Sequence, residues 1–167
     1  MRTIGIEEGR SAELFVVPYR HKYTSEPYLP IWMATELISF GALSKMLRNV
    51  DSTPLQKKIA WEFGQPEVLF SSWTHVLSTV RNTCAHHSRL WNRELVVKPL
   101  FPKSWRVAGI SNRRFYAVVL VIQTMLERVS PNSRWKERLK AHFNAHPSVD
   151  IAHMHFPPDW QNRRPWV

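Results

Sequence analysis

The sequence has a single cysteine, Cys84, among its 167 residues. One thiol excludes an intramolecular disulfide and suits a reducing compartment, so we expect a cytoplasmic protein. Long apolar runs are also missing, and Glu7, Glu8 and Glu13 stand where a signal peptide needs an apolar segment. The sequence therefore predicts neither export nor a membrane partner.

Acidic residues are few compared with basic ones. The chain has 13 Asp and Glu against 23 Lys and Arg, which gives a formal net charge of +10. This charge favours polyanionic partners through long-range attraction, and it leaves open whether the partner is a nucleic acid or another anionic surface. With 44% hydrophobic residues, the chain is long enough for one domain with a core.

Signals for a β-sheet or for an internal repeat are absent from the sequence. No pair of alternating apolar and polar runs stands out, whereas apolar residues recur at helical spacing in several segments. We therefore predict an all-α fold. Helices are expected from Pro30 to about Asn49, from Pro54 to Gly64, from Pro66 to about His86, from the capping residue Asn112 to Pro131, and over Ser133–Ala145, with a loop over Lys98–Ser111.

Proline and glycine divide the chain into three parts. Residues 1–29 are expected to form an irregular lead-in that allows one short helix near Glu7–Val16. Residues 30–146 should form the helical domain. The last part, 147–167, has too many prolines for a helix. We expect its aromatic side chains to dock on the body of the protein as an extended tail.

The densest group of chemically active side chains lies at the end of the helix predicted for residues 66–86. One face of that helix carries an apolar stripe, and steps of three or four residues align a polar stripe on the opposite face. The apolar stripe consists of Leu69, Trp73, Val76, Leu77, Val80 and Cys84, and the polar stripe of His75, Thr79, Asn82 and His86. We therefore expect a core helix whose end presents polar groups.

Arg81, Asn82 and His86 form the candidate catalytic group. A guanidinium can bind two phosphate oxygens, an imidazole can transfer a proton near neutral pH, and Asn82 can orient the imidazole or donate to a phosphate. RNA carries its own nucleophile, the 2′-hydroxyl, so these residue types suffice for cleavage without a metal or cofactor. The same residue types also cap helices, so the spacing alone does not decide between the two roles.

Basic and aromatic residues follow the candidate catalytic group along the chain. His87, Arg89 and Arg93 extend the positive charge, and Trp91 offers a ring on which a base can stack. These four are the candidate RNA-binding residues. Packing against the core is the alternative role for Trp91.

Three ordered segments carry a resemblance to a known family. They are Pro30–Ala34 with Ser39–Ser44, then Arg81–Arg93, and finally Phe156–Trp160 with Trp166. From about Tyr19 onward, the chain resembles the C-terminal half of the Abi-like (AbiD/AbiF-type) abortive-infection proteins of the HEPN superfamily. The resemblance implies a HEPN-like helical bundle and places Arg81, Asn82 and His86 on the R-x4-H motif of that superfamily.

The resemblance also implies an activity and partners. In catalytic members the motif supports metal-independent endoribonuclease activity, often in a composite site formed by two HEPN units. We therefore expect an RNA-cleaving protein of the phage-defence or toxin-antitoxin type that acts as a homodimer. Family members usually carry a longer N-terminal portion, so an N-terminal partner chain and a cognate antitoxin are further expected partners. The alternative is a noncatalytic HEPN module that binds RNA or a partner protein.

Metal binding is a weaker alternative for the histidines. One group consists of Cys84, His86 and His87, and the other of His142, His146, His153 and His155. Neither group has the four-ligand spacing that is typical of structural zinc sites. We therefore predict no metal and no cofactor.

Overall fold

The structure, a computed structural model, describes residues 14–166. These residues form eight α-helices and two 3₁₀ helices, with no β-strand among them, which confirms the predicted all-α fold. The chain divides into two compact units, residues 1–49 and 50–167. The boundary between them falls inside the helical domain predicted for residues 30–146. None of the helices within residues 14–166 is long and apolar enough to cross a membrane.

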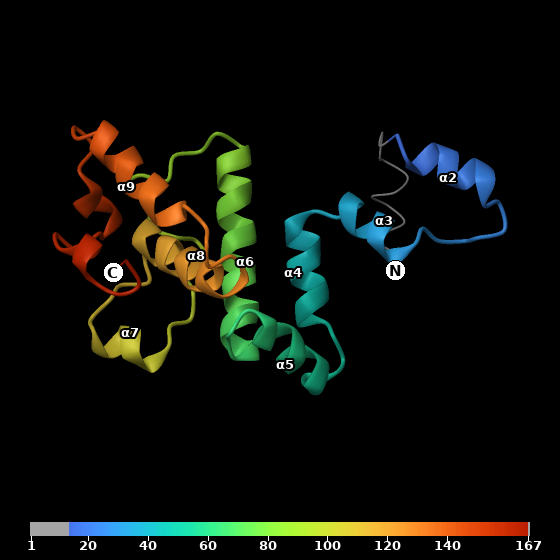
Figure 1. The fold of residues 1–167 in the computed structure, drawn as a ribbon, viewed down its shortest axis with the longest axis horizontal. Helices are drawn as coiled ribbons and strands as arrows, with labels where there is room; N and C mark the ends of the chain where they lie inside the picture. The colour runs from blue at the N-terminus through green and yellow to red at the C-terminus, as the bar shows by residue number, and fades with distance from the viewer. Residues whose placement is uncertain (1–13, 167) are drawn as a thin grey trace. The chain divides into compact units, whose positions relative to one another are not determined.

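The first unit has three short helices (Figure 1), and a small apolar core lies between the first two of them. They are α2 (Val16–Lys22), α3 (Ile31–Leu37) and α4 (Phe40–Arg48). Val16, Leu29 and Ala34 form the core. Helix α2 lies in the region predicted to be irregular. The helix tolerates Pro18 because this residue stands in the first turn, where the N–H that proline lacks would have no partner within the helix. The short helix predicted near Glu7–Val16 lies almost entirely outside the described residues.

The prediction of a single helix from Pro30 to Asn49 is wrong, because the helix is interrupted between α3 and α4. Ile38 and Ser39 are extended, with ψ angles of 140° and 154°. The hydroxyl of Ser39 accepts a hydrogen bond from the backbone N–H of Ala42 at 3.1 Å and so caps α4. Serine competes in this way with the hydrogen bonds of a continuous helix. The helical apolar spacing continues on both sides of the break, so periodicity alone did not reveal it.

The second unit is built around α8, which is buried along most of its length. Its helices are α5 (Thr53–Glu62), α6 (Glu67–Ala85), α7 (Lys103–Val107), α8 (Phe115–Val129) and α9 (Trp135–Ala145). Ala117 and Val118 of α8 pack with Val76 of α6, and Val119 and Leu120 pack with α9 and the tail. The ribbons of these helices are drawn in Figure 1. Helix α8 therefore joins the helix that carries the candidate catalytic group to the C-terminal part of the chain.

Two details of the segment before α8 correct the sequence prediction. The loop predicted over Lys98–Ser111 contains α7, whose Trp105 stacks on Trp73 of α6 with ring centroids 5.6 Å apart. Asn112 does not cap α8, because its side-chain amide donates to the carbonyl oxygen of Pro99 at 3.0 Å. Helix α8 begins after Arg114 without a side-chain cap. In both places a contact distant in sequence outweighs the local signal.

The tail packs its aromatic side chains into the core of the second unit. Met154, Phe156, Trp160 and Trp166 are buried in one cluster with residues of α8 and α9. The tail is not wholly extended, because 3₁₀ helices form over Ile151–Met154 and Trp160–Asn162. The carboxylate of Asp150 starts the first of them by accepting the N–H of Ala152 at 2.9 Å. Such single turns need no long run without proline.

Candidate functional site

Helix α6 places the candidate catalytic group by burying its middle and exposing its end. Trp73 and Val76 are completely buried, and the indole N–H of Trp73 donates to the carbonyl oxygen of Leu100 at 2.8 Å. Close packing of this kind fixes both the position and the rotation of the helix. Cys84, predicted to continue the buried stripe, is exposed, because α6 has left the core by that turn.

Helix α6 ends in a Schellman motif that involves two predicted site residues. His86 is the C-cap residue, and His87 follows with a positive φ of 52°. The backbone N–H of His87 donates to Cys84 at 2.9 Å, and that of Ser88 donates to Thr83 at 3.0 Å. A residue in the left-handed region at this position is usually glycine. The backbone therefore turns sharply at the two histidines.

Arg81, Asn82 and His86 lie on the exposed surface at this helix end. The Arg81 guanidinium donates to the side-chain oxygen of Asn82 at 3.3 Å, and the backbone N–H of His86 donates to the carbonyl oxygen of Asn82 at 3.0 Å. Among residues 14–166, the imidazole of His86 makes no hydrogen bond. The geometry thus joins Arg81 to Asn82 and leaves the imidazole open to solvent.

The segment after α6 is held against the tail by Trp91. Its indole N–H donates to the carbonyl oxygen of Asp150 at 3.0 Å, and its ring meets that of His153 edge-on with centroids 5.2 Å apart. The ring also packs against the aromatic core cluster. These contacts give Trp91 a packing role, and they position the neighbouring residues of the same segment.

Asn92 and Arg114 form a second link between this segment and the tail. Asn92 has a φ of 51° in a turn closed by the N–H of Arg93 and the carbonyl oxygen of Leu90 at 3.2 Å. The guanidinium of Arg114 donates to the side-chain oxygen of Asn92, and it also donates to the carbonyl oxygen of His153 at 3.2 Å. Arg89 and Arg93, two predicted RNA-binding residues, are exposed on this anchored segment.

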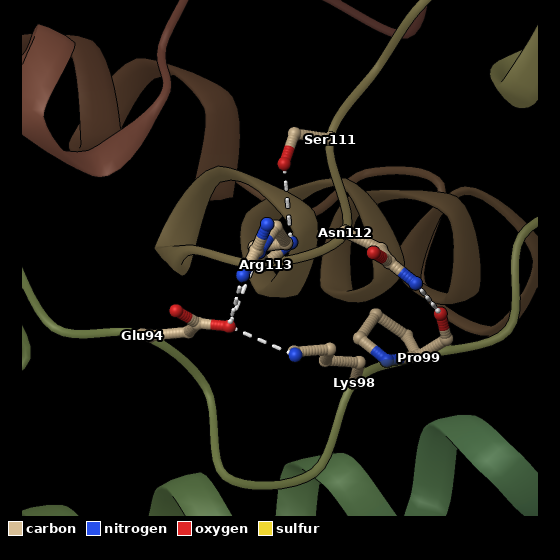
Figure 2. Close-up of polar contacts among 6 residues, drawn as sticks. All are labelled: Glu94, Lys98, Pro99, Ser111, Asn112 and Arg113. Atoms are coloured by element: carbon tan, nitrogen blue, oxygen red, sulfur yellow. Dashed lines mark hydrogen bonds and ion pairs between the residues drawn. The ribbon is translucent and has the colours of Figure 1, made fainter.

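Glu94 sits between two cations just beyond the predicted RNA-binding residues (Figure 2). Its Oε1 lies 2.8 Å from Nζ of Lys98 and 3.0 Å from Nη2 of Arg113. The hydrogen bond from Lys98, and then the one from Arg113, lower the pKa of Glu94 below its ordinary value of 4.5. This cluster fixes the chain after the motif to the residues that precede α8.

Sequence reasoning missed Arg113 and Arg114 as supports of the site. Each reaches about twenty positions back along the chain, Arg113 to Glu94 and Arg114 to Asn92. Two adjacent arginines directly before an apolar helix were the available signal. Their partners follow from the tertiary fold, which sequence spacing does not reveal.

Other features of the structure lie apart from the candidate catalytic group. A hollow of about 620 Å³, lined by Phe143 and Trp160 among others, is formed by α9 and the tail. Within residues 14–166, no group of three His, Cys, Asp or Glu side chains is arranged to hold a metal ion. The candidate group is therefore an open surface of guanidinium, amide and imidazole.

Comparison with known proteins identifies the family. No curated protein and no solved structure matches the chain. The family described as Abi-like protein matches residues 1–92, which include Arg81, Asn82 and His86 and end before Arg93 and the aromatic tail. The match covers more than half of the chain and, as the family's description suggests, points to a role in abortive infection. The chain belongs to the Abi-like protein family.

Proposed function

We propose that this Abi-like protein is a metal-independent endoribonuclease that acts in phage defence or as the toxin of a toxin-antitoxin pair. The supporting observation is that Arg81 and His86 are exposed at one end of a rigid core helix, with Asn82 hydrogen-bonded to Arg81. The sequence resembles the HEPN superfamily, and Arg81 and His86 stand at the spacing of its R-x4-H motif. The net charge of +10 favours RNA as a partner.

In the proposed reaction, His86 and Arg81 act on the phosphodiester of a bound RNA. An imidazole takes the proton of the 2′-hydroxyl while the O2′–P bond forms and the P–O5′ bond breaks. The departing O5′ accepts a proton, so the products carry a 2′,3′-cyclic phosphate and a 5′-hydroxyl. Arg81 stabilises the charge that develops on the phosphoryl oxygens, and its bond to Asn82 orients the guanidinium toward them.

The C-terminal end of a helix carries partial negative charge, which disfavours a phosphate. A phosphate at the end of α6 therefore needs several cations nearby. Besides Arg81, the exposed side chains of His87, Arg89 and Arg93 follow within the next turns of the chain. We propose that these three bind the RNA strand, while Trp91 positions the segment through its contact with Asp150.

A homodimer with a composite site completes the proposal. One copy offers one His86, whereas the reaction needs a proton acceptor and a proton donor. The exposed motif is also open to water, which weakens its electrostatic interactions. A second copy facing the first would supply the second imidazole and exclude water. An antitoxin that covers this surface would inhibit the reaction, whereas an additional N-terminal chain would supply the portion that longer family members carry.

The test is the rate of RNA cleavage by purified wild-type protein, His86→Ala and the control His142→Ala. His142 is an exposed histidine on α9, outside the proposed site. Loss of general acid-base catalysis should lower the rate of His86→Ala by about a hundredfold or more. The control should cleave as the wild type does. Equal cleavage by all three proteins would exclude His86 as the catalyst.

A noncatalytic role is the second candidate, since the candidate catalytic side chains lie exposed rather than in an enclosed pocket. In that case the wild type and His86→Ala would bind RNA equally well and neither would cleave it. Binding is measured in parallel with cleavage on the same RNA pool, so the two functions give different results.

A further inference from the structure

A hollow of about 210 Å³ lies within the second unit, where α8 ends and α9 begins. Most of its lining residues are polar, and they come from the last turns of α8, the connection and the first turn of α9. None of the candidate catalytic or RNA-binding residues lines it. Its volume is below the roughly 300–1,000 Å³ of sites for drug-sized molecules, so it suits one small polar group.

Gln123 of α8 is a buried amide with one unsatisfied atom at this hollow. The residue lines the hollow although it is only 4% exposed. Its Nε2 donates to Oε1 of Glu127 at 3.2 Å, whereas its Oε1 is buried and has no hydrogen-bond partner within residues 14–166. A buried carbonyl oxygen without a donor is costly, and such atoms usually have a partner. The amide therefore marks the hollow as a place for a hydrogen-bond donor.

Two carboxylates add negative charge to the same hollow. Oε1 of Glu127 accepts from Gln123 and lies 3.7 Å from Nζ of Lys136. Within the described residues, the other oxygen of Glu127 and the carboxylate of Glu137 make no hydrogen bond or ion pair. The C-terminal end of α8 carries partial negative charge as well. The hollow therefore has several acceptors that lack a donor.

Cations are scarce at this place, although the chain has a net charge of +10. Lys136 is the only cation among the described residues that line the hollow. The side chain of Arg128, in the last turn of α8, lies beside Gly64, and Arg138 of α9 is exposed without lining the hollow. Two carboxylates thus face one ammonium. One further positive charge would balance them.

We propose that this hollow binds a guanidinium group. A guanidinium is a planar cation with five N–H donors, so it can donate to Oε1 of Gln123 and to the carboxylates of Glu127 and Glu137. An ammonium supplies the charge with only three donors. The group belongs either to an arginine side chain of a partner protein or to a small free molecule, since both present the same cation.

The test is an NMR titration of the full chain with ethylguanidine and, separately, with the peptide acetyl-Gly-Arg-Gly-amide. The variants are Glu137→Gln and Glu127→Gln, both at exposed positions, and the control is Glu62→Gln, an exposed residue of α5 that does not line the hollow. Each variant of the hollow should weaken binding about tenfold, as expected for one lost charge-assisted contact. Glu62→Gln should bind as the wild type does.

A neutral probe tests whether the charge is required. Ethylurea resembles ethylguanidine in shape but has no charge, and we expect it to bind at least about tenfold more weakly. Because the carboxylate of Glu137 has no partner within residues 14–166, Glu137→Gln removes charge from the hollow without breaking a contact of the fold. Weaker binding by this variant therefore reports on the ligand and not on misfolding.

The two guanidinium probes separate the two sources of the group. Tighter binding of the peptide supports an arginine of a partner protein, and tighter binding of ethylguanidine supports a small free molecule. The proposal is overturned if neither probe binds, if both variants of the hollow bind as tightly as the wild type, or if ethylurea binds as tightly as ethylguanidine. His86→Ala should bind ethylguanidine normally, so this test is independent of the proposed cleavage.

Discussion

Helices α5, α6 and α7 of the second unit end in the same backbone motif, but α6 has a histidine where α5 and α7 have glycine. At the end of α5, Gly64 has a φ of 66°, its N–H donates to Trp61 at 2.8 Å, and the N–H of Gln65 donates to Ala60 at 3.1 Å. The end of α6 repeats both bonds around His87, whose φ is 52°. Glycine adopts this conformation freely, whereas a residue with a Cβ costs about 1–2 kcal/mol there.

The difference between Gly64 and His87 shows that the end of α6 has a less stable residue whose side chain can take part in chemistry. The end of α5 reverses the chain and uses the residue that does so at least cost. The end of α6 keeps an imidazole at a position where glycine would be more stable. Backbone strain of this kind is concentrated at functional sites, where the surrounding structure maintains it. At the end of α6, that support comes from Trp91 and Arg114, which tie the following segment to the tail.

Of the changes considered, removing the guanidinium of Arg81 should have the largest effect. It removes a proposed catalytic group from the end of α6, which the end of α5 does not have. We expect Arg81→Ala to lower the rate of RNA cleavage by about a hundredfold or more, as for loss of a donor to a developing oxyanion. Arg81→Lys keeps the positive charge but loses the bidentate geometry of the guanidinium, so its cleavage rate should fall between those of the wild type and Arg81→Ala. Cleavage rates of both variants, with Arg138→Ala as the control, test this. An unchanged rate in Arg81→Ala would remove the guanidinium from the mechanism.

Loss of the Trp91 anchor should destabilise the second unit, because the strained end of α6 depends on the contacts that hold the following segment. The end of α5 has glycine at the corresponding position and needs no such anchor. Trp91→Ala removes a half-buried ring and the hydrogen bond to Asp150. We expect the free energy of unfolding to fall by about 2 kcal/mol. Trp91→Phe keeps most of the packing and should cost about 1 kcal/mol. Urea denaturation measures both values, and equal stability of Trp91→Ala and wild type would contradict the anchoring role.

Exchanging residues at the two left-handed positions should shift stability in opposite directions. Gly64→Ala should destabilise by about 1 kcal/mol, because the backbone strain is the cost while the added Cβ meets only ordinary contacts with Arg128. His87→Gly should stabilise by about 0.5 kcal/mol, since relief of strain exceeds the entropy cost of glycine. Thermal unfolding checks both signs. Destabilisation by His87→Gly would show that the imidazole contributes packing instead.

The same variant sharpens the functional side of the comparison. If His87 binds the RNA strand, His87→Gly should gain stability while its affinity for RNA falls by a few-fold. RNA binding measured at two salt concentrations distinguishes a lost charge contact from an altered fold. Unchanged affinity at both would remove His87 from the RNA-binding residues.

A small pH effect should come from Glu94, which fixes the segment beyond the end of α6. Its pKa is lowered in the folded protein by hydrogen bonds from Lys98 and Arg113. Its stabilising contribution is therefore present above the unfolded-state pKa, and it is lost as the pH falls through the lower, folded-state value. Below about pH 4.5, Glu94→Gln should lose less thermal stability per pH unit than the wild type. Parallel curves for the two proteins would contradict the contribution of this pair.

Local signals in the sequence were sufficient for α5, α6, α8 and α9 of the second unit, whereas α7 lies in a segment predicted to be a loop. Pro54 lies in the first turn of α5 and Gly64 follows its C-cap residue, and the run from Pro66 to His86 matches α6 within one residue at each end. These helices combine a start signal, an apolar face and a stop signal. The break between α3 and α4 was missed because Ser39 caps a helix inside a run that stays apolar at helical spacing on both sides.

For the candidate site, the sequence supplied the residues but not their supports. Arg81, Asn82 and His86 could be found because they share one helix end, where spacing determines which side chains are neighbours. The contact of Trp91 with Asp150 and the bonds of Arg114 join segments that are distant along the chain. Such contacts depend on how α8 and the tail pack, which no local pattern encodes.

The most direct test of the proposed cleavage site is the chemistry of the RNA ends that the wild-type protein produces in excess chelator. Metal-independent attack by the 2′-hydroxyl predicts products with 2′,3′-cyclic phosphate and 5′-hydroxyl ends, formed at the same rate with and without chelator. Products with 3′-hydroxyl and 5′-phosphate ends, or cleavage that stops when metal ions are removed, would contradict a mechanism that relies on Arg81, Asn82 and His86 alone.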